Sequence, residues 1–410
     1  MRRTGVAAVG MACAVALVAA GCGSDNGGSG GSSSGGGSST IKVGLLTALS
    51  GPGSAAAAAA VRGAEARFAA YEEDGKGCAG KLDFQLDKAD DASSAQGALS
   101  GTQKLVQQDK VYGMLTISAF FYGASPWLTT QGKTTPVIGG AWDGAKEWTS
   151  TDDNLFNSAQ VPDYTTVYSL AGDYLTSQGA SKVAGIAYVS PSSQAGLTNG
   201  FKSIEAAGLK KGYYNDSVPF GSTDVGPLVL GIIDSGADAL YLTINPDTAF
   251  AVVAGLKQAN YPLKAIVAPT GYGADLLQSA PAVQAGQGVS FSTAITPIET
   301  QTPATKRLQK ALIDHSDNKS GIPGFYESQG WLTSDLFLHG LEEAGCDASQ
   351  ADYIKKMQQD KDWDANGLYP KPIPQTTTKY DEQCSYYVKL QGEGFVPVEG
   401  AQPLCGKPVS

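Results

Sequence analysis

The chain has 410 residues and a formal net charge of −10, and 17% of its residues are charged. An acidic chain is a poor partner for nucleic acid or for anionic lipid, because both of these carry negative charge. About 370 residues follow Thr40, more than one hydrophobic core ordinarily holds, so we expect two lobes. No stretch in this part reaches about eighteen unbroken apolar residues, which predicts no membrane span there.

Residues 1–21 have the pattern of a secretory signal peptide. Arg2 and Arg3 precede a short apolar stretch that ends in small residues just before Cys22. The ending Val-Ala-Ala-Gly-Cys, residues 18–22, resembles the bacterial lipobox, in which the cysteine is acylated and becomes the first residue of the mature protein. The resemblance implies lipidation of Cys22. The alternative is an ordinary signal peptide that happens to contain a cysteine.

Residues 22–40 comprise the cysteine and a segment made almost only of glycine and serine. Such a segment cannot bury enough apolar surface to offset its ordering entropy, and we expect a flexible tether with a mean reach of roughly 24 Å. The folded body is therefore predicted on the extracytoplasmic face of the cell membrane, which it contacts through the lipid anchor only.

Four cysteines follow the tether, namely Cys78, Cys346, Cys384 and Cys405. An even number outside the cytoplasm predicts two disulfides, for which three connectivities are possible. A predicted hairpin at residues 386–398 makes Cys384–Cys405 the shortest closure, which leaves Cys78–Cys346. There is no paired-cysteine zinc motif, and the chain contains only two histidines, so we expect no metal site.

Strand-like and helix-like segments alternate along the body. Strands are predicted at residues 41–46, 82–86, 112–116, 136–138, 182–189, 239–244, 264–268 and 288–293, with helices at 55–73, 94–108, 122–131, 164–177, 196–207 and 246–260. Continuous apolar strands between amphipathic helices indicate two doubly wound α/β lobes with parallel sheets. Late helices at 303–316, 326–344 and 350–360 have no strand between them, so we expect them to cover the first lobe.

Four segments in the same order resemble the type I periplasmic binding proteins of the branched-chain amino-acid transporter class. These segments are residues 41–53, 87–96, 222–224 and 326–345. The resemblance implies two lobes joined by a three-strand hinge, with the ligand in the cleft. We place the N-terminal lobe at residues 41–160 and 297–368, and the C-terminal lobe at residues 161–296 and 369–410.

Ligands of open parallel sheets bind outside the carboxyl ends of the strands. There the loops at 116–119 and 139–141 offer backbone N–H groups and hydroxyls suited to a small anion or zwitterion. The family resemblance implies that Ser118, Ala119 and Ala141 hold the carboxylate of the ligand. The alternative is that both loops are merely tight turns.

The cleft also departs from the pattern of the family. The amino-acid binders hold the ligand ammonium with an acidic residue at the position that is Thr270 here, and the aromatic positions that cover the ligand correspond to Ala56, Ala195 and Ile244. Asp143 could replace the ammonium partner if its side chain turns into the cleft, or it could cap the helix that follows.

Aromatic residues crowd the predicted mouth of the cleft, where the family often has small polar residues. They are Phe120, Phe121, Tyr122 and Trp142, and we include Tyr272 among the predicted ligand contacts. Their presence indicates either wall packing or a ligand other than leucine, either an amino acid or a larger apolar or aromatic compound.

We expect a binding protein and not an enzyme, with no cofactor. His315 and His339 lie on late helices away from the cleft, and the glycine-rich loop at 50–54 lacks the lysine of a phosphate loop. The resemblance implies a monomeric solute-binding protein that delivers a small molecule to the permease subunits of an ABC importer. The alternative is a ligand-sensing lipoprotein that acts through a separate signalling partner.

Overall fold

The computed structural model of the protein describes residues 39–160, 166–222 and 224–409. The predicted signal peptide, Cys22 and all but the end of the tether lie outside these ranges. None of the helices within them combines the length and the apolar character that crossing a membrane requires.

The first sheet has five parallel strands in the order β2-β1-β3-β4-β5. Their bounds are β1 Ser39–Thr47, β2 Leu82–Asp90, β3 Gly113–Ile117, β4 Val137–Gly139 and β5 Leu155–Asn157. Four of these strands were predicted, whereas β5 was missed because three residues are too few to show a periodic pattern.

The second sheet is mixed, with the order β12-β11-β10-β9-β8-β6-β7 and β13 paired to β11. Its strands are β6 Lys182–Tyr188, β7 Lys210–Val218, β8 Ala239–Thr243, β9 Ala265–Ala268, β10 Ser290–Thr293, β11 Gln383–Gln391, β12 Gly394–Pro397 and β13 Leu404–Gly406. Strands β6 to β10 pair in parallel, and β11 joins them antiparallel. The predicted C-terminal hairpin is confirmed as β11 and β12.

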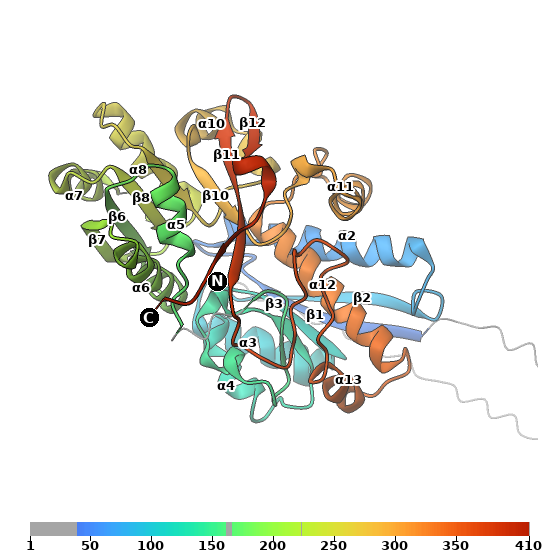
Figure 1. Cartoon of the computed structure of the whole chain (residues 1–410). Helices are drawn as coiled ribbons and strands as arrows, with labels where there is room; N and C mark the ends of the chain where they lie inside the picture. The colour runs from blue at the N-terminus through green and yellow to red at the C-terminus, as the bar shows by residue number, and fades with distance from the viewer. Residues whose placement is uncertain (1–38, 161–165, 223, 410) are drawn as a thin grey trace, which may run out of the picture. The chain divides into compact units, whose positions relative to one another are not determined.

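Helices around the first sheet come from both ends of the chain. They are α1 Ser54–Ala57, α2 Ala59–Asp74, α3 Ala95–Gln103 with the π-helix η1 Lys104–Asp109, α4 Ser125–Leu128, α11 Pro303–His315, α12 Phe325–Ala344 and α13 Gln350–Met357. Figure 1 shows the late α12 and α13 beside β1, β3 and the early α2, as predicted. The helix predicted at 122–131 is shorter, because only the turn η2 Phe121–Gly123 and α4 form there.

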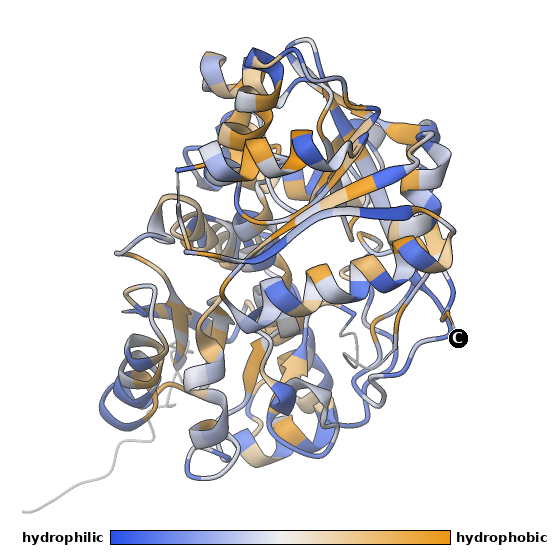
Figure 2. Cartoon of the chain, turned by 90° about the vertical axis from the view of Figure 1, so that its left-hand side faces the viewer, coloured by the Kyte–Doolittle hydropathy of each residue, from blue (hydrophilic) through white to orange (hydrophobic). Residues whose placement is uncertain are grey.

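The second sheet is covered by α5 Leu170–Ser177, α6 Pro191–Ala206, α7 Gly226–Ser235, α8 Pro246–Gln258, α9 Ala274–Leu277 and α10 Ala280–Gly286. Proline occupies one of the first two positions of α6, α7, α8 and α10, where its missing N–H has no partner to lose. Figure 2 shows hydrophobic and hydrophilic residues mixed along the helices, as expected of helices that pack on one side only.

The central strands of each sheet are buried on both faces. In β1, Val43 and Leu45 face the core shared with α2, α11 and α12, whereas Leu46 faces the core on the α3 side. In β6, Ile186 and Ala187 likewise belong to different cores. We call the first sheet with its two cores the first lobe, and the second sheet with its two cores the second lobe.

The chain passes between the lobes three times, after β5, after β10 and before β11. Ile295 and Ile298, which follow β10, already pack in the core of the first lobe. Tyr369 and Ile373 also belong to that core, although they lie beyond residue 368, where we expected the first lobe to end.

Both predicted disulfides are present. Cys78–Cys346 joins the loop after α2 to the end of α12, and Cys384–Cys405 joins β11 to β13 at a directly paired position. The sequence separations are 268 and 21 residues. A closed loop of about twenty residues is worth roughly 3 kcal/mol by chain-entropy arguments.

Helices α2 and α12 cross at two glycines. A Cβ atom on Gly63 would lie 1.8 Å from the carbonyl oxygen of Glu327, and one on Gly330 would lie 2.0 Å from that of Ala60. Backbone therefore meets backbone at this crossing, and neither helix has a flexible side chain that could move aside.

We expect Gly330→Ala to lower the free energy of unfolding by about 1–3 kcal/mol, because the added methyl must force the two helices apart. Urea unfolding followed by circular dichroism measures the loss. Gly226→Ala, at the start of α7, is the matched control, since nothing lies within 4 Å of the added atom. Equal stability of the two variants would contradict the close crossing.

Candidate functional site

The carboxyl ends of the first-sheet strands are tied to one another. Thr47 at the end of β1 donates a hydrogen bond to the carbonyl of Ile117 at the end of β3 (2.8 Å). Asp90 at the end of β2 accepts hydrogen bonds from the backbone N–H groups of Leu49 and Ser50 (2.8 and 3.1 Å). The loops after β1, β2 and β3 therefore form one connected edge.

Aromatic side chains from both lobes meet near these strand ends. Phe120, after β3, packs edge-on against Phe220, after β7, with ring centroids 5.4 Å apart. Tyr188, the last residue of β6, lies 4.7 Å from Phe220. Tyr326, near the start of α12, shares a hydrogen bond with the side chain of Asn245, after β8. We call Phe120, Tyr188 and Phe220 the aromatic cluster.

Ser118 lies where the resemblance placed the ligand carboxylate, but its hydroxyl already has a partner. The hydroxyl donates to the buried carboxylate of Asp91 and accepts from the N–H of Phe120. Burial raises the pKa of Asp91, although hydrogen bonds from Ser118 and Ser93 oppose the shift. Ser118 therefore holds the loop in shape, while the half-buried Ala119 beside it presents only backbone and a methyl group.

The side chain of Asp143 is buried inside the first lobe. Its carboxylate is fully buried and accepts hydrogen bonds from the N–H of Ala145 (2.8 Å) and from the indole N–H of Trp148 (3.1 Å). Burial raises the pKa of Asp143 to about 7, although the two hydrogen bonds act in the opposite direction. The sequence left open either a carboxylate facing the ligand or one that caps the helix after Gly144. The carboxylate closes a turn onto Ala145 and binds Trp148, while the short helix η4 Lys146–Thr149 carries no side-chain cap.

Phe121 is also directed inward, which corrects its assignment to the mouth of the cleft. Its side chain is fully buried in the core of the first lobe, with its ring centroid 5.4 Å from that of Trp148. Phe120 packs against the same core but remains half-buried.

Ala141 and Trp142 lie in the short helix η3 Ala141–Asp143, directly after β4. Trp142 is half-buried, and its ring covers Gly140 so closely that a Cβ atom there would lie 2.2 Å from it. Trp142 thus sits at a strand end with part of its indole accessible, as a ligand contact requires. Tyr122 is half-buried as well, 6.4 Å from Phe120.

In the second lobe, the predicted contacts are mostly occupied by packing. Ile244 is buried in the core, so its side chain is not available to cover a ligand. Thr270 is nearly buried, and its hydroxyl lies 3.4 Å from the carbonyl oxygen of Ile244. Ala195 is half-buried in α6.

Tyr272 contacts the first lobe. Its hydroxyl donates to the carboxylate of Glu299 (2.7 Å) and accepts from the N–H of Ile298 (3.0 Å). Both partners lie in the short helix η5 Ile298–Thr300, just after the chain returns from β10. Both hydrogen-bonding roles of the Tyr272 hydroxyl are therefore taken up by the protein itself.

Sequence reasoning missed Phe220, Tyr188 and Tyr326. Phe220 follows β7, an edge strand of the second sheet. The sequence of β7, Lys-Lys-Gly-Tyr-Tyr-Asn-Asp-Ser-Val, is mostly polar and so does not have the apolar pattern by which the other strands were predicted. Tyr326 opens a helix, so a search of strand ends alone does not find it. Tyr188 ends β6, a predicted strand, and could have been found by the same rule that found Trp142.

Two surface cavities lie elsewhere. One, of about 510 Å³, is an open groove over β1 and β2 lined by Lys42, Asp87, Lys104 and their neighbours. The other, of about 140 Å³, lies between α8 and β9 and is lined by Val253 and Ile266 among others. None of the predicted site residues lines either of them.

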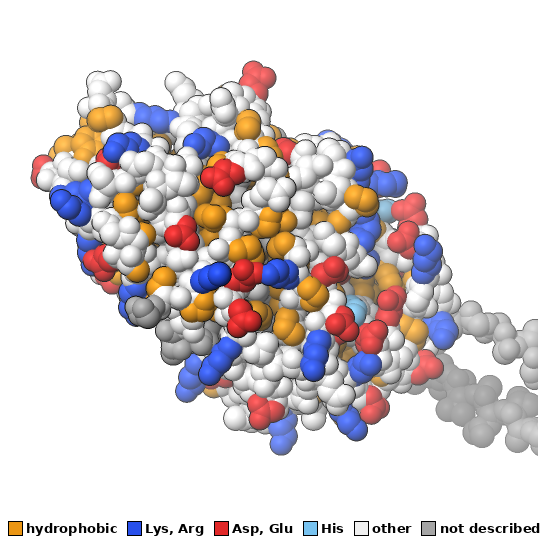
Figure 3. All heavy atoms as spheres, in the orientation of Figure 1, with side chains coloured by type: hydrophobic (Ala, Val, Ile, Leu, Met, Phe, Trp, Pro, Cys, Tyr) orange, Lys and Arg blue, Asp and Glu red, His pale blue; other side chains and the backbone are white. Residues whose placement is uncertain are grey.

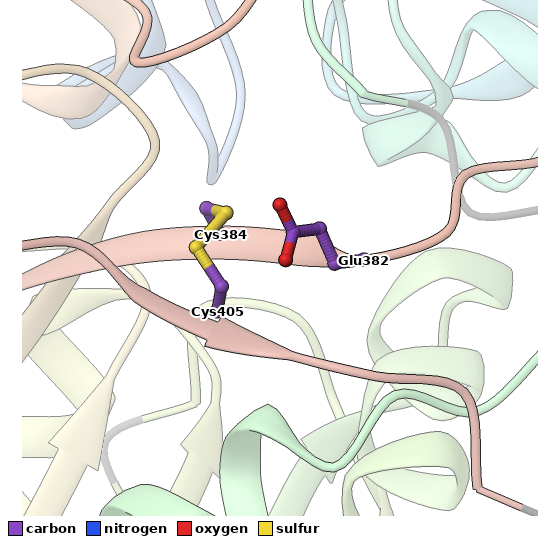
Figure 4. Close-up of side chains that lie close together, drawn as sticks. All are labelled: Glu382, Cys384 and Cys405. Carbon is purple, nitrogen blue, oxygen red and sulfur yellow. A yellow bond between two sulfur atoms is a disulfide. The ribbon is translucent and has the colours of Figure 1, made fainter.

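One group of potential metal ligands occurs among the described residues, formed by Glu382, Cys384 and Cys405. Figure 4 shows Glu382 beside the two sulfurs, which are bonded to each other. The disulfide leaves the carboxylate as the sole donor, and that carboxylate pairs with Lys371. These residues do not fit a metal ion.

The two histidines are engaged on late helices. His315 contacts Glu73 (3.0 Å), and His339 contacts Asp360 (2.8 Å). On the face shown in Figure 3, basic and acidic side chains are interspersed, and the basic ones form no continuous surface that would suit a polyanion.

Comparison with known proteins agrees with this geometry. A family model described as periplasmic binding protein matches residues 40–394, and the chain therefore belongs to the periplasmic binding protein family. Its fold is the type I form of that family, as in the solute-binding proteins of branched-chain amino-acid transporters. No curated protein matches the chain in sequence.

Several solved structures share the fold. A solute-binding protein of an ABC transporter from R. palustris, in complex with benzoate, has a TM-score of 0.72 at 18% identity, covering 89% of this chain and 97% of its own. A branched-chain amino-acid ABC transporter protein from Thermus thermophilus with bound valine has a TM-score of 0.72 at 16% identity, with coverages of 90% and 97%. A fatty acid ABC transporter substrate-binding protein from Thermomonospora curvata has a TM-score of 0.70 at 17% identity, with coverages of 89% and 92%.

The buried carboxylate of Asp143 predicts a pH dependence of stability. Its folded pKa of about 7 lies above the unfolded value of about 3.9, so its contribution to stability is lost progressively as the pH rises from about 4 to about 7. Asp143→Asn should remove this loss, which amounts to at most about 1.4 kcal/mol for each pH unit in that range.

Urea unfolding at pH 4, 5, 6, 7 and 8 measures the effect as the difference in stability between the variant and the wild type. We expect this difference to shift in favour of Asp143→Asn as the pH rises. Asp234→Asn, exposed on α7, is the matched control. A difference that does not change with pH would show that the Asp143 carboxylate is not held in this buried state.

Proposed function

We propose that the protein is an extracytoplasmic solute-binding protein that captures a small organic ligand between its two lobes and delivers it to an ABC importer. The observation that carries this proposal is the meeting of loops from the two lobes at the aromatic cluster, where Phe120 and Phe220 touch. Membership of the periplasmic binding protein family supports it. Structural neighbours bind benzoate and valine in this fold.

The side chains at the cleft favour a ligand with an apolar or aromatic body. Phe120, Tyr122 and Trp142 are half-buried in the loops after β3 and β4, so they offer ring surface that a ligand can cover. Position 270 is a threonine and not an acidic residue, and the carboxylate of Asp143 already accepts a hydrogen bond from the indole N–H of Trp148. A buried ammonium group without an acidic partner would be costly, which disfavours ordinary α-amino acids.

Transport requires that the ligand favour one arrangement of the lobes. A ligand that contacts loops of both lobes binds the closed arrangement more tightly than the open one, and so shifts the population toward closure. Rotation about the three connections between the lobes is the corresponding hinge motion. The closed, ligand-bound monomer is the form that the permease subunits would recognise.

Anchoring belongs to the same proposal. The lipobox-like sequence at residues 18–22 and the glycine- and serine-rich segment up to Thr40 support a body held near the membrane by a lipid on Cys22. A short tether keeps the binding protein close to its transporter while leaving it free to turn.

We expect leucine, isoleucine and valine to bind weakly or not at all, and benzoate to bind more tightly. Isothermal titration calorimetry with leucine and benzoate as probes measures both. Micromolar or tighter binding of leucine, about −8 kcal/mol or better, would contradict the proposed ligand class.

Tryptophan fluorescence locates the binding event. The ligand probe that binds in calorimetry should change the emission of the protein, and Trp142→Ala should abolish most of that change. Trp127→Phe is the matched control, because Trp127 lies on α4 and pairs with Gln131. An equal loss of signal in the two variants would place the ligand away from Trp142.

Cys22→Ala should release the protein from the membrane or stall its processing, because the acylated thiol would be missing. Fractionation of the native host and immunoblotting measure the membrane-bound share. The conservative Cys22→Ser variant should behave alike, since a hydroxyl does not replace the thiol in the anchor. An unchanged membrane fraction would exclude lipidation at this residue.

A further inference from the structure

The pocket of about 140 Å³ in the second lobe lies at the opposite end of the sheet from the ligand-directed loops. It forms where α8 ends and β9 begins, and so at the amino ends of the strands. The loops at the cleft follow the carboxyl ends, and a helix of 13 residues such as α8 spans about 20 Å between the two ends. The pocket is therefore separate from the cleft, and we call it the α8–β9 pocket.

Half of the residues that line this pocket are apolar or aromatic, and they are firmly held. Val253, Leu256 and Ile266 belong to the core of the second lobe and are at most 6% exposed. Tyr261 and Leu263 are half-buried against the same core, and the phenol of Tyr261 donates to a backbone carbonyl (2.8 Å). A cavity of about 150 Å³ lined by such side chains holds benzene. The α8–β9 pocket is thus of the right size for one six-membered ring.

Lys264 brings hydrogen-bond donors to the pocket. Its ammonium lies 2.8 Å from the carboxylate of Asp238, a contact that uses one of its three N–H groups. The same carboxylate accepts hydrogen bonds from the backbone N–H groups of Ser181 and Lys182 (both 2.9 Å), so Lys264 is not its sole partner. Two donors of Lys264 therefore remain for another anion.

Lys257 adds a second positive charge that no carboxylate balances. Its ammonium donates to three backbone carbonyls at the end of α10, those of Gln284, Ala285 and Gln287 (3.3, 2.8 and 3.0 Å). These partners are neutral. Partial burial lowers the pKa of Lys257, and no carboxylate in the described part of the chain opposes that shift. Two lysines and the single carboxylate of Asp238 leave an excess positive charge at the pocket, which complements a small anion.

We propose that the α8–β9 pocket is a second ligand site, which binds a small monocarboxylate whose apolar body has about the size of one ring. The body lies against Val253, Leu256 and Ile266, and the carboxylate accepts hydrogen bonds from Lys264 in the field of Lys257. A ligand in this place contacts α8, β9 and the segment after α10 together, so its binding stabilises the second lobe by mass action. The site goes beyond the proposed transport function, because it does not depend on what the cleft binds.

A benzoate titration followed by ¹H–¹⁵N nuclear magnetic resonance tests the site, because the pocket and the cleft report through different amides. The amides of Leu263, Ala265 and Gly288 report on the pocket, and those of Ala119 and Gly140 report on the cleft. We expect saturable shifts of the pocket amides with a Kd of about 1 mM, as for other ligands of this small size. Benzamide, the neutral isostere, should bind there roughly fivefold more weakly or worse, because it lacks the charge that Lys264 recognises.

Two variants with matched controls separate the charge from the apolar lining. Lys264→Met keeps the length of the side chain but removes its donors, and should raise the Kd at the pocket roughly three- to tenfold; Lys202→Met, exposed on α6 of the same lobe, is its control. Leu263→Glu places a carboxylate in the lining and should abolish saturable shifts there; Leu230→Glu, at a position 62% exposed on α7, is its control. Neither control should change the Kd at the pocket. Thermal unfolding confirms that every variant is folded.

The pattern of shifted amides decides between the outcomes. Pocket shifts that do not saturate, or that persist unchanged in folded Lys264→Met, would overturn the second site. Shifts confined to the cleft amides would also overturn it, while supporting the proposed ligand of the cleft. Shifts confined to the pocket amides would support the second site and reject benzoate as the ligand of the cleft. Pocket shifts that depend on protein concentration without any benzoate would show a second copy of the chain in the pocket, and would overturn the inference.

Discussion

Burial of the central strands of both sheets on both faces is the constraint on which the rest of the structure depends. A strand covered above and below can expose only its ends, so all chemistry directed at a ligand must come from the loops there. The first sheet has too few helices in its own stretch of chain to cover it. Helices α11 and α12 supply the missing cover, and the chain must therefore return to the first lobe after completing most of the second.

Much of the fold could be predicted because the signals were local. The apolar runs that became β1, β3, β6 and β8 indicated buried parallel strands, and the late helices without strands indicated a cover for the first lobe. The edge strand β7 escaped prediction because edge strands tolerate polar residues on their solvent side. The short β5 escaped because its place is decided by pairing with β4 and not by its own sequence.

For the site, the sequence predicted which loops carry the candidate residues but not where their side chains point. Ser118, Trp142 and Asp143 do follow the strand ends where the sequence placed them. The directions of their side chains depend on partners that the local sequence does not reveal, such as Asp91 from a neighbouring loop for Ser118. Contacts between the lobes were missed altogether, since Phe220 and Tyr326 meet their neighbours through the tertiary fold alone.

The disulfide between Cys78 and Cys346 has a consequence for how the chain matures. The chain is synthesised from its N-terminus, so β1 to β5 are made before α12. Until α12 is made, one face of the first sheet lacks its cover. Beyond the tether, cysteines appear in the order in which they pair, Cys78 before Cys346 and then Cys384 before Cys405. An oxidase that joins each new thiol to the one still waiting would make both native bonds directly, without any need for an isomerase.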